Sequence, residues 1–260
     1  MDLTDTTALI TGASGGIGEE FAVRLADQHV NLVLVARRTE KLQDLRARLL
    51  AAHPDLTIDT VGCDLSRPGS SAELAATIHD RGHHIGVLIN NAGVGAHGLF
   101  AEQSPEDMAA QIQLNCGSLV DLTGRFLPAM VAAKRGVVIN VASTAAFQPI
   151  PTMAVYGATK AFVLSFTEAL WEETRRSGVR VLTLCPGATE TEFFARTGEQ
   201  FMTRGRETPA QVVETALAAL DKSGPTVISG WMNKLMAPGY RFMPRRLMPT
   251  MAQRLVATTG

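Results

Sequence analysis

The feature that most constrains the fold of this chain is a glycine-rich turn close to the N-terminus. A short apolar strand pattern at Thr7–Thr11 runs into residues 12–18 (GASGGIG), and a helical pattern follows at residues 19–28. Glycines let the backbone turn tightly and approach a ligand, because no Cβ stands in the way. A helix that begins there directs free N–H groups and its positive end at an anion. The turn could be a simple connection, but its strand–turn–helix context predicts a site for a dinucleotide pyrophosphate.

The next 200 residues alternate between apolar strand patterns and helical patterns. Strands are expected at residues 31–36, 56–63, 85–89, 136–141, 179–184 and 226–229, with helices at 39–53, 68–81, after Ser104, at 154–176 and after Thr208. This alternation predicts an α/β fold with one doubly wound, Rossmann-like parallel sheet of about seven strands and helices on both faces. Crossovers should be right-handed, and ligands should bind at the carboxyl ends of the strands. No linker interrupts residues 1–230, which we therefore expect to form one dinucleotide-binding and catalytic domain.

Two arginines follow the second expected strand, where a dinucleotide-binding fold contacts the adenosine ribose. An acidic residue there would bind the 2′-hydroxyl of NAD, whereas arginine can pair with the 2′-phosphate of NADP. A solvated loop arginine is the alternative. We expect NADP as the cofactor, with Arg37 as the first contact and Arg38 as the second.

Tyr156 and Lys160 stand four residues apart in a helical pattern, so both side chains lie on one face of that helix. A phenol ionises near pH ~10 and is a poor acid or base at neutral pH, but a nearby ammonium favours the phenolate. The pair could also be a half-buried tyrosine and a solvated lysine. Ser143 precedes Tyr156 by thirteen residues, which lets both hydroxyls meet one substrate oxygen. Asn115 lies inside a long expected helix, where asparagine needs a structural or functional reason.

Composition excludes several other classes of protein. The net charge of −1 argues against a basic protein that coats nucleic acid, and the 46% hydrophobic and 19% charged content is that of an ordinary globular protein. The three cysteines are far apart, so neither a disulfide framework nor a metal site is expected, and reduced thiols suit a cytoplasmic location. The sequence shows no signal peptide and no apolar run of the roughly 18 residues that a transmembrane helix needs.

The last part of the chain differs in composition from the rest. Residues 222–260 contain no acidic residue, and methionines are interleaved with six basic residues: Lys222, Lys234, Arg241, Arg245, Arg246 and Arg254. We treat residues 231–260 as a basic, Met-rich extension, which prolines keep from forming one long helix. It could contact a membrane surface or an acyl substrate, or pack across its own domain or a partner subunit.

Taken together and in order, these motifs resemble the short-chain dehydrogenase/reductase family over about residues 7–229. The matching residues are Thr11-Gly12-x-x-x-Gly16-x-Gly18, Asn90-Asn91-Ala92-Gly93, Asn115, Ser143, Tyr156, Lys160 and Pro186-Gly187 followed by Thr191. The Arg37-Arg38 strand end and residues 147–149 look most similar to an NADP-preferring branch that includes D-alanine-transfer-operon-type and 3-oxoacyl-type reductases.

The resemblance implies a role for each matching residue. Tyr156 would donate a proton to a carbonyl oxygen that Ser143 also binds, Lys160 would lower the tyrosine pKa and hold the nicotinamide ribose, and Asn115 would hold a relay water. The cofactor-binding residues would be Gly12, Ser14, Gly16, Ile17 and Gly18 around the pyrophosphate, Asp64 and Leu65 at the adenine, Asn91, Ala92 and Gly93 on the adenosine side, and Pro186, Gly187, Thr189 and Thr191 at the nicotinamide.

The family relationship also implies where a substrate binds, namely residues 94–100, 145–153 and 190–206. The last segment contains Phe193, Phe194, Phe201 and Met202, so we expect a small-molecule apolar carbonyl or secondary-alcohol substrate, unless these side chains form a lid that packs on itself. Relatives commonly pair through the helices that here contain Asn115 and Tyr156, which predicts a homodimer or homotetramer. The rival interpretations are a non-catalytic NADP-binding regulator and a membrane-associated lipid or 3-oxoacyl reductase.

Overall fold

The chain folds around a seven-stranded parallel sheet in the order β3-β2-β1-β4-β5-β6-β7. This computed structural model describes residues 3, 4, 6–193, 206–240, 246, 248–250 and 252. The strands are β1 (Thr7–Thr11), β2 (Asn31–Ala36), β3 (Ile58–Gly62), β4 (Ile85–Asn90), β5 (Gly136–Val141), β6 (Val179–Cys185) and β7 (Thr226–Ile228). The predicted doubly wound α/β fold is confirmed.

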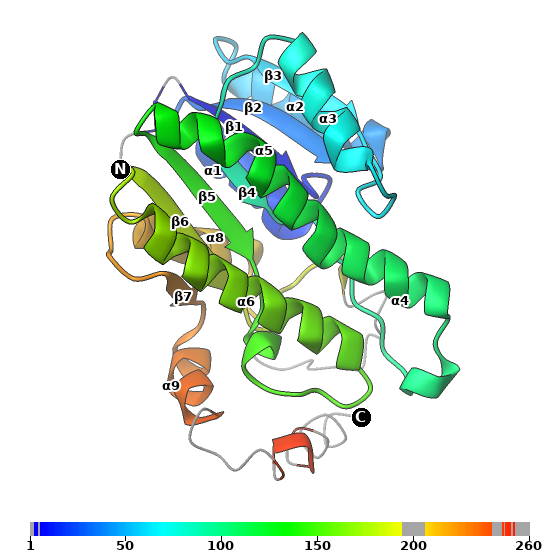
Figure 1. The fold of residues 1–260 in the computed structure, drawn as a ribbon. Helices are drawn as coiled ribbons and strands as arrows, with labels where there is room; N and C mark the ends of the chain where they lie inside the picture. Colours follow the sequence, from blue (N-terminus) through cyan, green and yellow to red (C-terminus); the bar gives the residue numbers. More distant parts are fainter. Residues whose placement is uncertain are drawn as a thin grey trace.

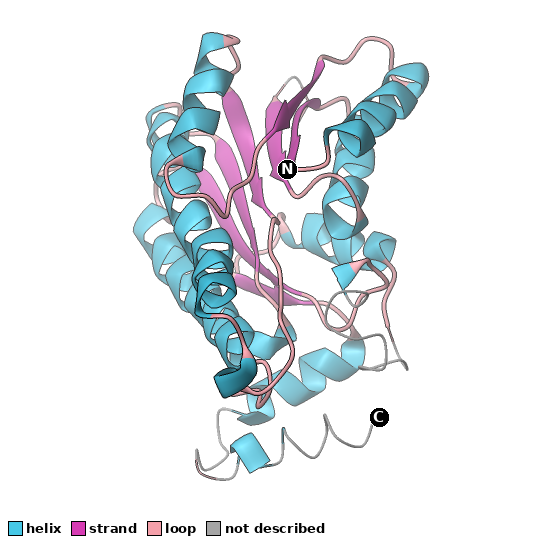
Figure 2. Ribbon diagram, turned by 90° about the vertical axis from the view of Figure 1, so that its right-hand side faces the viewer, coloured by secondary structure: helices cyan, strands magenta, loops and turns pink. Residues whose placement is uncertain are grey.

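Helices cover both faces of the sheet, as Figures 1 and 2 show. One face carries α1 (Gly16–Ala26), α2 (Thr39–Ala52) and α8 (Pro209–Ala219), and the other carries α3 (Ser70–Asp80), α5 (Ser118–Ala132) and α6 (Ala154–Thr174). Neighbouring strand residues point to opposite layers: Ile10 is buried under the first set of helices and Leu9 under the second. Helices bury both faces of the sheet, and for this reason the strands are nearly continuous runs of apolar residues.

The predicted long helix after Ser104 is interrupted in the structure. It consists of α4 (Pro105–Ile112), a π-helical turn at Gln113–Gly117 and α5. Ser104 caps α4 by accepting a hydrogen bond from the Asp107 backbone N–H. Thr208 and Gln211 form a capping box at the start of α8. The π turn was not predicted, and it contains Asn115.

The described part of the C-terminal extension begins with α9 (Trp231–Tyr240), and further helical residues occur at 248–250 and 252. Trp231 is 73% exposed and Leu235 is 70% exposed, while Ala237 is buried. The extension therefore turns one side of α9 toward the domain. The tail residues Arg241, Met243, Arg245, Met251 and Arg254 lie outside the described residues, and the domain boundary at residue 230 stays a prediction.

Within the part of the chain that the structure describes, no helix combines the length and the apolar character needed to cross a membrane.

Candidate active site

A pocket of about 550 Å³ opens at the carboxyl ends of the strands, between β1 and β4. The chain reverses its direction of winding there, because β2 and β3 lie on one side of β1 while β4 to β7 lie on the other. Most of the predicted site residues line this pocket: Gly12, Ser14, Gly16, Ile17, Arg37, Arg38, Asp64, Leu65, Asn91, Ala92, Gly93, Ser143, Tyr156, Lys160, Pro186, Gly187, Thr189 and Thr191. Gly18 and Asn115 are not among the lining residues.

The glycine turn connects β1 to α1 in a conformation that other residues rarely adopt. Gly12 and Gly16 have φ angles of +68° and +58°. A Cβ on Gly18 would lie 2.4 Å from the Gly12 carbonyl oxygen and 2.5 Å from the Asn91 amide nitrogen. Gly18 therefore acts through close packing beneath the turn and does not face the pocket.

Asn91, which follows β4, holds this turn in place. Its side-chain amide donates to the carbonyl oxygens of Thr11, at 2.9 Å, and Gly12, at 3.3 Å. The Thr11 hydroxyl in turn accepts from the backbone N–H groups of Asn91 and Ala92, each at 3.0 Å. The two motifs thus form one rigid unit at the centre of the sheet edge.

The two arginines after β2 are in different surroundings. Arg37 is exposed, whereas Arg38 is held above the glycine turn by Ser14, whose hydroxyl oxygen accepts from the Arg38 Nη2 at 3.0 Å. Arg38 also pairs with Glu192 at 2.5 Å. Hydrogen bonds from Ser66 lower the pKa of the Asp64 carboxyl. The positive charge of Arg37 also lowers this pKa.

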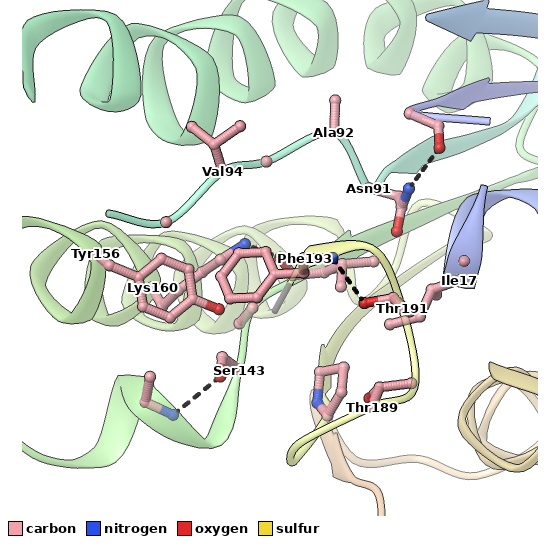
Figure 3. Close-up of a pocket in the computed structure, with 18 of the residues that line it drawn as sticks. Ile17, Asn91, Ala92, Val94, Ser143, Tyr156, Lys160, Thr189, Thr191 and Phe193 are labelled. Carbon is pink, nitrogen blue, oxygen red and sulfur yellow. Dashed lines mark hydrogen bonds between the residues drawn. The ribbon is translucent and has the colours of Figure 1, made fainter. Parts of the chain in front are cut away.

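Three side chains converge on the inner end of the pocket (Figure 3). Tyr156 and Lys160 extend from the first two turns of α6, and Ser143 lies just beyond β5. Ser143 acts to lower the pKa of Tyr156, which places the two side chains near each other, and the Ser143 hydroxyl oxygen accepts a hydrogen bond from the Ala145 backbone N–H at 3.1 Å. Lys160 is 5% exposed; its ammonium donates to the Val141 carbonyl oxygen at 2.8 Å and lies 5.8 Å from the centroid of the tyrosine ring.

The ionisation of this group differs from the expectation. Burial raises the pKa of Tyr156 to about 12, and the hydrogen bond to Ser143 offsets only part of that increase. Burial also lowers the pKa of Lys160 to about 8. The prediction that the ammonium makes the phenol unusually acidic is therefore wrong for this structure, because burial raises the pKa of the phenol and so disfavours the phenolate.

Asn115 sits in the π turn, where the backbone widens between α4 and α5. It is 2% exposed, its carbonyl oxygen accepts from the Val94 N–H at 3.0 Å, and its amide donates to the Val94 carbonyl at 2.9 Å. The same amide donates to the Thr159 hydroxyl at 3.0 Å, beside Lys160 on α6. Asn115 thus fixes the loop after Gly93 to the helix that carries Tyr156.

The segment after Thr189 folds back into the pocket. Thr191 packs against the glycine turn, since a Cβ on Gly16 would lie 2.7 Å from its methyl group. The Phe193 ring lies beside the Tyr156 ring (Figure 3), and the two ring centroids are 5.3 Å apart. A Cβ on Gly95 would lie 2.6 Å from the same phenylalanine. Phe193 therefore fills the space beside the tyrosine, while Phe194, Phe201 and Met202 lie outside the described residues.

Sequence reasoning did not identify the side of the pocket that the C-terminal extension supplies. Asn233, Met236, Ala237 and Ala252 all line the pocket. The alternation of basic and methionine residues indicated an unusual segment but not its position. The packing of α9 beyond β7 brings Asn233, Met236 and Ala237 to the site.

The fold agrees with comparisons to known proteins. The family model for short chain dehydrogenases matches residues 6–201. The chain belongs to the short-chain dehydrogenase family.

Among curated relatives, this short-chain dehydrogenase is similar to a very-long-chain 3-oxoacyl-CoA reductase from Mycosarcoma maydis, with 35% identity over 87% of this chain and 65% of the relative. The match therefore covers less than two thirds of that protein. Among solved structures, a short-chain dehydrogenase from Sphingobium yanoikuyae in complex with NADPH is 34% identical, with a TM-score of 0.81 over 91% of this chain and 93% of the other. A 7beta-hydroxysteroid dehydrogenase structure has a TM-score of 0.88 at 28% identity, over 97% and 99% of the two chains.

Proposed function

We propose that this short-chain dehydrogenase is an NADP(H)-dependent oxidoreductase that acts on an apolar carbonyl or secondary alcohol, with Tyr156 as the acid/base. The observation that carries the proposal is that Ser143, Tyr156 and Lys160 line the same end of one pocket, which continues to the glycine turn. Two hydroxyls that share one position can hold a single substrate oxygen and exchange a proton with it.

The residues present fit a dinucleotide. The positive φ angles of Gly12 and Gly16, and the absence of side chains on them, leave backbone N–H groups accessible at the start of α1 for a pyrophosphate. Lys160 would face the nicotinamide half, with Thr189 and Thr191 opposite, and the loop at Asn91–Gly93 would lie on the adenosine side. When bound, the cofactor supplies or accepts the hydride.

The raised pKa of Tyr156 suits the reductive direction. A phenol whose pKa is about 12 remains protonated at neutral pH, so it can donate a proton to a carbonyl oxygen. Hydrogen bonding to Ser143 then stabilises the phenolate that remains. Asn115 acts here by holding the Val94 backbone, and therefore the loop that forms the wall opposite the tyrosine.

NADP is favoured over NAD because the pocket carries cations at the end of β2, where an NAD-binding chain would place a carboxylate. The NADPH bound to the Sphingobium relative supports this preference. Affinities for NADPH and NADH, measured before and after Arg37→Ala and Arg38→Ala, test it. If the ratio of the NADPH and NADH affinities is unchanged in both variants, neither arginine binds the 2′-phosphate.

An apolar substrate is supported by the pocket wall around the tyrosine. Ile150, Met153, Phe193 and Met236 line that part of the pocket. The names of the similar proteins, a very-long-chain 3-oxoacyl-CoA reductase and a 7beta-hydroxysteroid dehydrogenase, point to bulky apolar substrates as well.

The test compares the parent with Tyr156→Phe on a panel of aldehydes, ketones and 3-oxoacyl thioesters, followed by NADPH absorbance. We expect turnover to fall by at least about 100-fold, because general acid catalysis typically contributes that much, while NADPH binding is retained. Equal turnover by the two proteins would remove the catalytic role. A parent that binds NADPH but turns over no carbonyl compound would favour the non-catalytic regulator.

The exposed side of α9 favours a second candidate, a reductase that works at an anionic lipid surface. Trp231, Met232, Leu235 and Met236 are each at least 43% exposed, and residues 222–260 contain no acidic residue. Co-sedimentation with vesicles containing anionic lipid should decrease for the double variant Trp231→Ser, Leu235→Ser. Unchanged co-sedimentation would exclude this role, and a loss of self-association in the variant would instead identify α9 as an interface between copies.

Pairing of subunits and a cytoplasmic location stay predictions. Ile112 on α4, Val120 and Val131 on α5, and Phe162 on α6 are exposed apolar residues on the helices where pairing is expected. Light scattering of the parent and of Phe162→Ser tests that surface, and a monomeric parent would contradict the prediction.

A further inference from the structure

Outside the catalytic group, one carboxylate binds two cationic side chains at the edge of the cofactor pocket. Glu192 accepts from the Arg38 guanidinium through one oxygen and from the Lys41 ammonium through the other, both at 2.5 Å. Arg38 ends the loop after β2, Lys41 lies in the first turn of α2, and Glu192 comes from the segment that follows Thr189. The three groups join parts of the chain that are about 150 residues apart in sequence.

Arg38 is held in an orientation that leaves one part of its guanidinium group available. Its Nε and Nη2 atoms donate to the Ser14 hydroxyl, at 3.3 Å and 3.0 Å, and Nη2 also donates to the Ser14 carbonyl at 3.2 Å. Nη1 is the atom that binds Glu192. The glycine turn thus fixes the arginine so that Nη1 and the Lys41 ammonium face the same acceptor.

The position of this acceptor is that of the adenosine ribose end of a dinucleotide, next to β2 and the glycine turn. A phosphate offers three oxygens and close to two negative charges, whereas a carboxylate offers two oxygens and one charge. The same two cations can therefore bind a 2′-phosphate, and with more charge, but not while Glu192 occupies them.

The attachment of Glu192 is also weak enough to be displaced. The Glu192, Lys41 and Arg38 side chains are 54%, 47% and 37% exposed. Ion pairs with this exposure are typically worth at most about 1 kcal/mol each, because water screens them. The two cations lower the pKa of Glu192 to about 2, so the competing carboxylate is charged throughout the neutral range.

We propose that Arg38 and Lys41 together form the 2′-phosphate site and that Glu192 is an internal competitor for it, which a 2′-phosphate must displace. This inference rests on the proposed NADP(H) function and adds Lys41 and Glu192 to the residues that determine cofactor preference. NAD has no 2′-phosphate, so it does not compete with Glu192.

The test uses the fragments 2′,5′-ADP and 5′-AMP, which differ only in the 2′-phosphate and do not reach Tyr156. Calorimetric titration of the full chain gives their affinities without any turnover. For Glu192→Gln we expect about threefold tighter binding of 2′,5′-ADP and unchanged binding of 5′-AMP, since removing a screened ion pair is worth less than 1 kcal/mol. For Lys41→Gln we expect about threefold weaker binding of 2′,5′-ADP only. Salt at about 0.5 M should reduce both effects.

Glu190→Gln is the matched control, because it removes an exposed carboxylate two residues earlier on the same segment. It should leave both affinities unchanged. The proposal is overturned if Glu192→Gln weakens the binding of 2′,5′-ADP, or if it changes the affinities for 2′,5′-ADP and 5′-AMP equally. It is also overturned if Glu190→Gln has the same effect, which would indicate a general charge effect.

Failure of the proposed function has a different signature. If the parent binds 2′,5′-ADP no better than 5′-AMP, both the proposed NADP preference and this inference are wrong. A parent that prefers 2′,5′-ADP, together with a Glu192→Gln variant that keeps the same ratio, would remove only the role of Glu192.

Discussion

The ring of Phe193 lies against the ring of Tyr156, with centroids 5.3 Å apart and planes inclined by 46°. Phe193 reaches this position because Gly95, across the pocket, has no side chain to exclude it. An apolar ring next to the proposed proton donor limits the size of the groups that can flank a reacting carbonyl.

Phe193→Ala should therefore shift the enzyme toward bulkier ketones. We expect kcat/KM for a ketone with two large substituents to rise by roughly 10-fold relative to kcat/KM for a methyl ketone. One or two methylene groups in an apolar pocket change the discrimination between substrates by a factor of this size. Phe162→Ala is the control, because this phenylalanine is 45% exposed on α6 and does not line the pocket. An unchanged ratio in Phe193→Ala would show that the ring does not limit substrate size.

Lys160 should make stability depend on pH. Its pKa falls from 10.5 to about 8 on folding, so the unfolded chain binds more protons between these values and stability rises as the pH rises. Relative to Lys160→Met, the free energy of unfolding of the parent should increase by about 2 kcal/mol between pH 7 and pH 10. Urea unfolding at each pH measures the difference. A difference that does not vary with pH would contradict the lowered pKa.

Gly18→Ala should destabilise the protein and weaken cofactor binding. The new Cβ would lie 2.4 Å from the Gly12 carbonyl oxygen, so the glycine turn must shift. We expect a loss of about 1–3 kcal/mol in urea unfolding, as for other overpacked sites. Gly124→Ala is the control: it lies on the exposed side of α5 with no atom within 4 Å of a new Cβ, and it should stabilise by roughly 1 kcal/mol. Equal effects of the two substitutions would exclude steric conflict as the cause.

Asn115→Ala should cost more stability than Thr159→Val. Removing the asparagine leaves both polar groups of the half-buried Val94 backbone without this partner, at no more than about 1–3 kcal/mol for each group. Thr159→Val removes one bond of Asn115 and keeps the other two. Unfolding free energies compare the variants, and hydrogen exchange at Val94 should quicken only in Asn115→Ala. Equal exchange at Val94 in both would show that Asn115 does not hold this loop.

The order of strands and helices, the glycine turn and the Ser143–Tyr156 pair could be predicted from sequence because each depends on local spacing. Apolar runs of three to seven residues between helical patterns specify parallel strands, and the carboxyl ends of such strands share one edge. Residues at those ends were therefore expected to meet, and most of them line one pocket.

The tertiary structure decided the features that depend on burial and on contacts between distant segments. The pKa of Tyr156 rises because the folded chain removes water from the phenol, which no spacing of residues reveals. The π turn at Asn115 and the Glu192 contact with Arg38 and Lys41 depend on how separate elements pack. Sequence determined which groups at the strand ends reach the site, whereas packing added the residues of the C-terminal extension and set the ionisation and partners of the site groups, because desolvation and long-range contacts exist only in the folded chain.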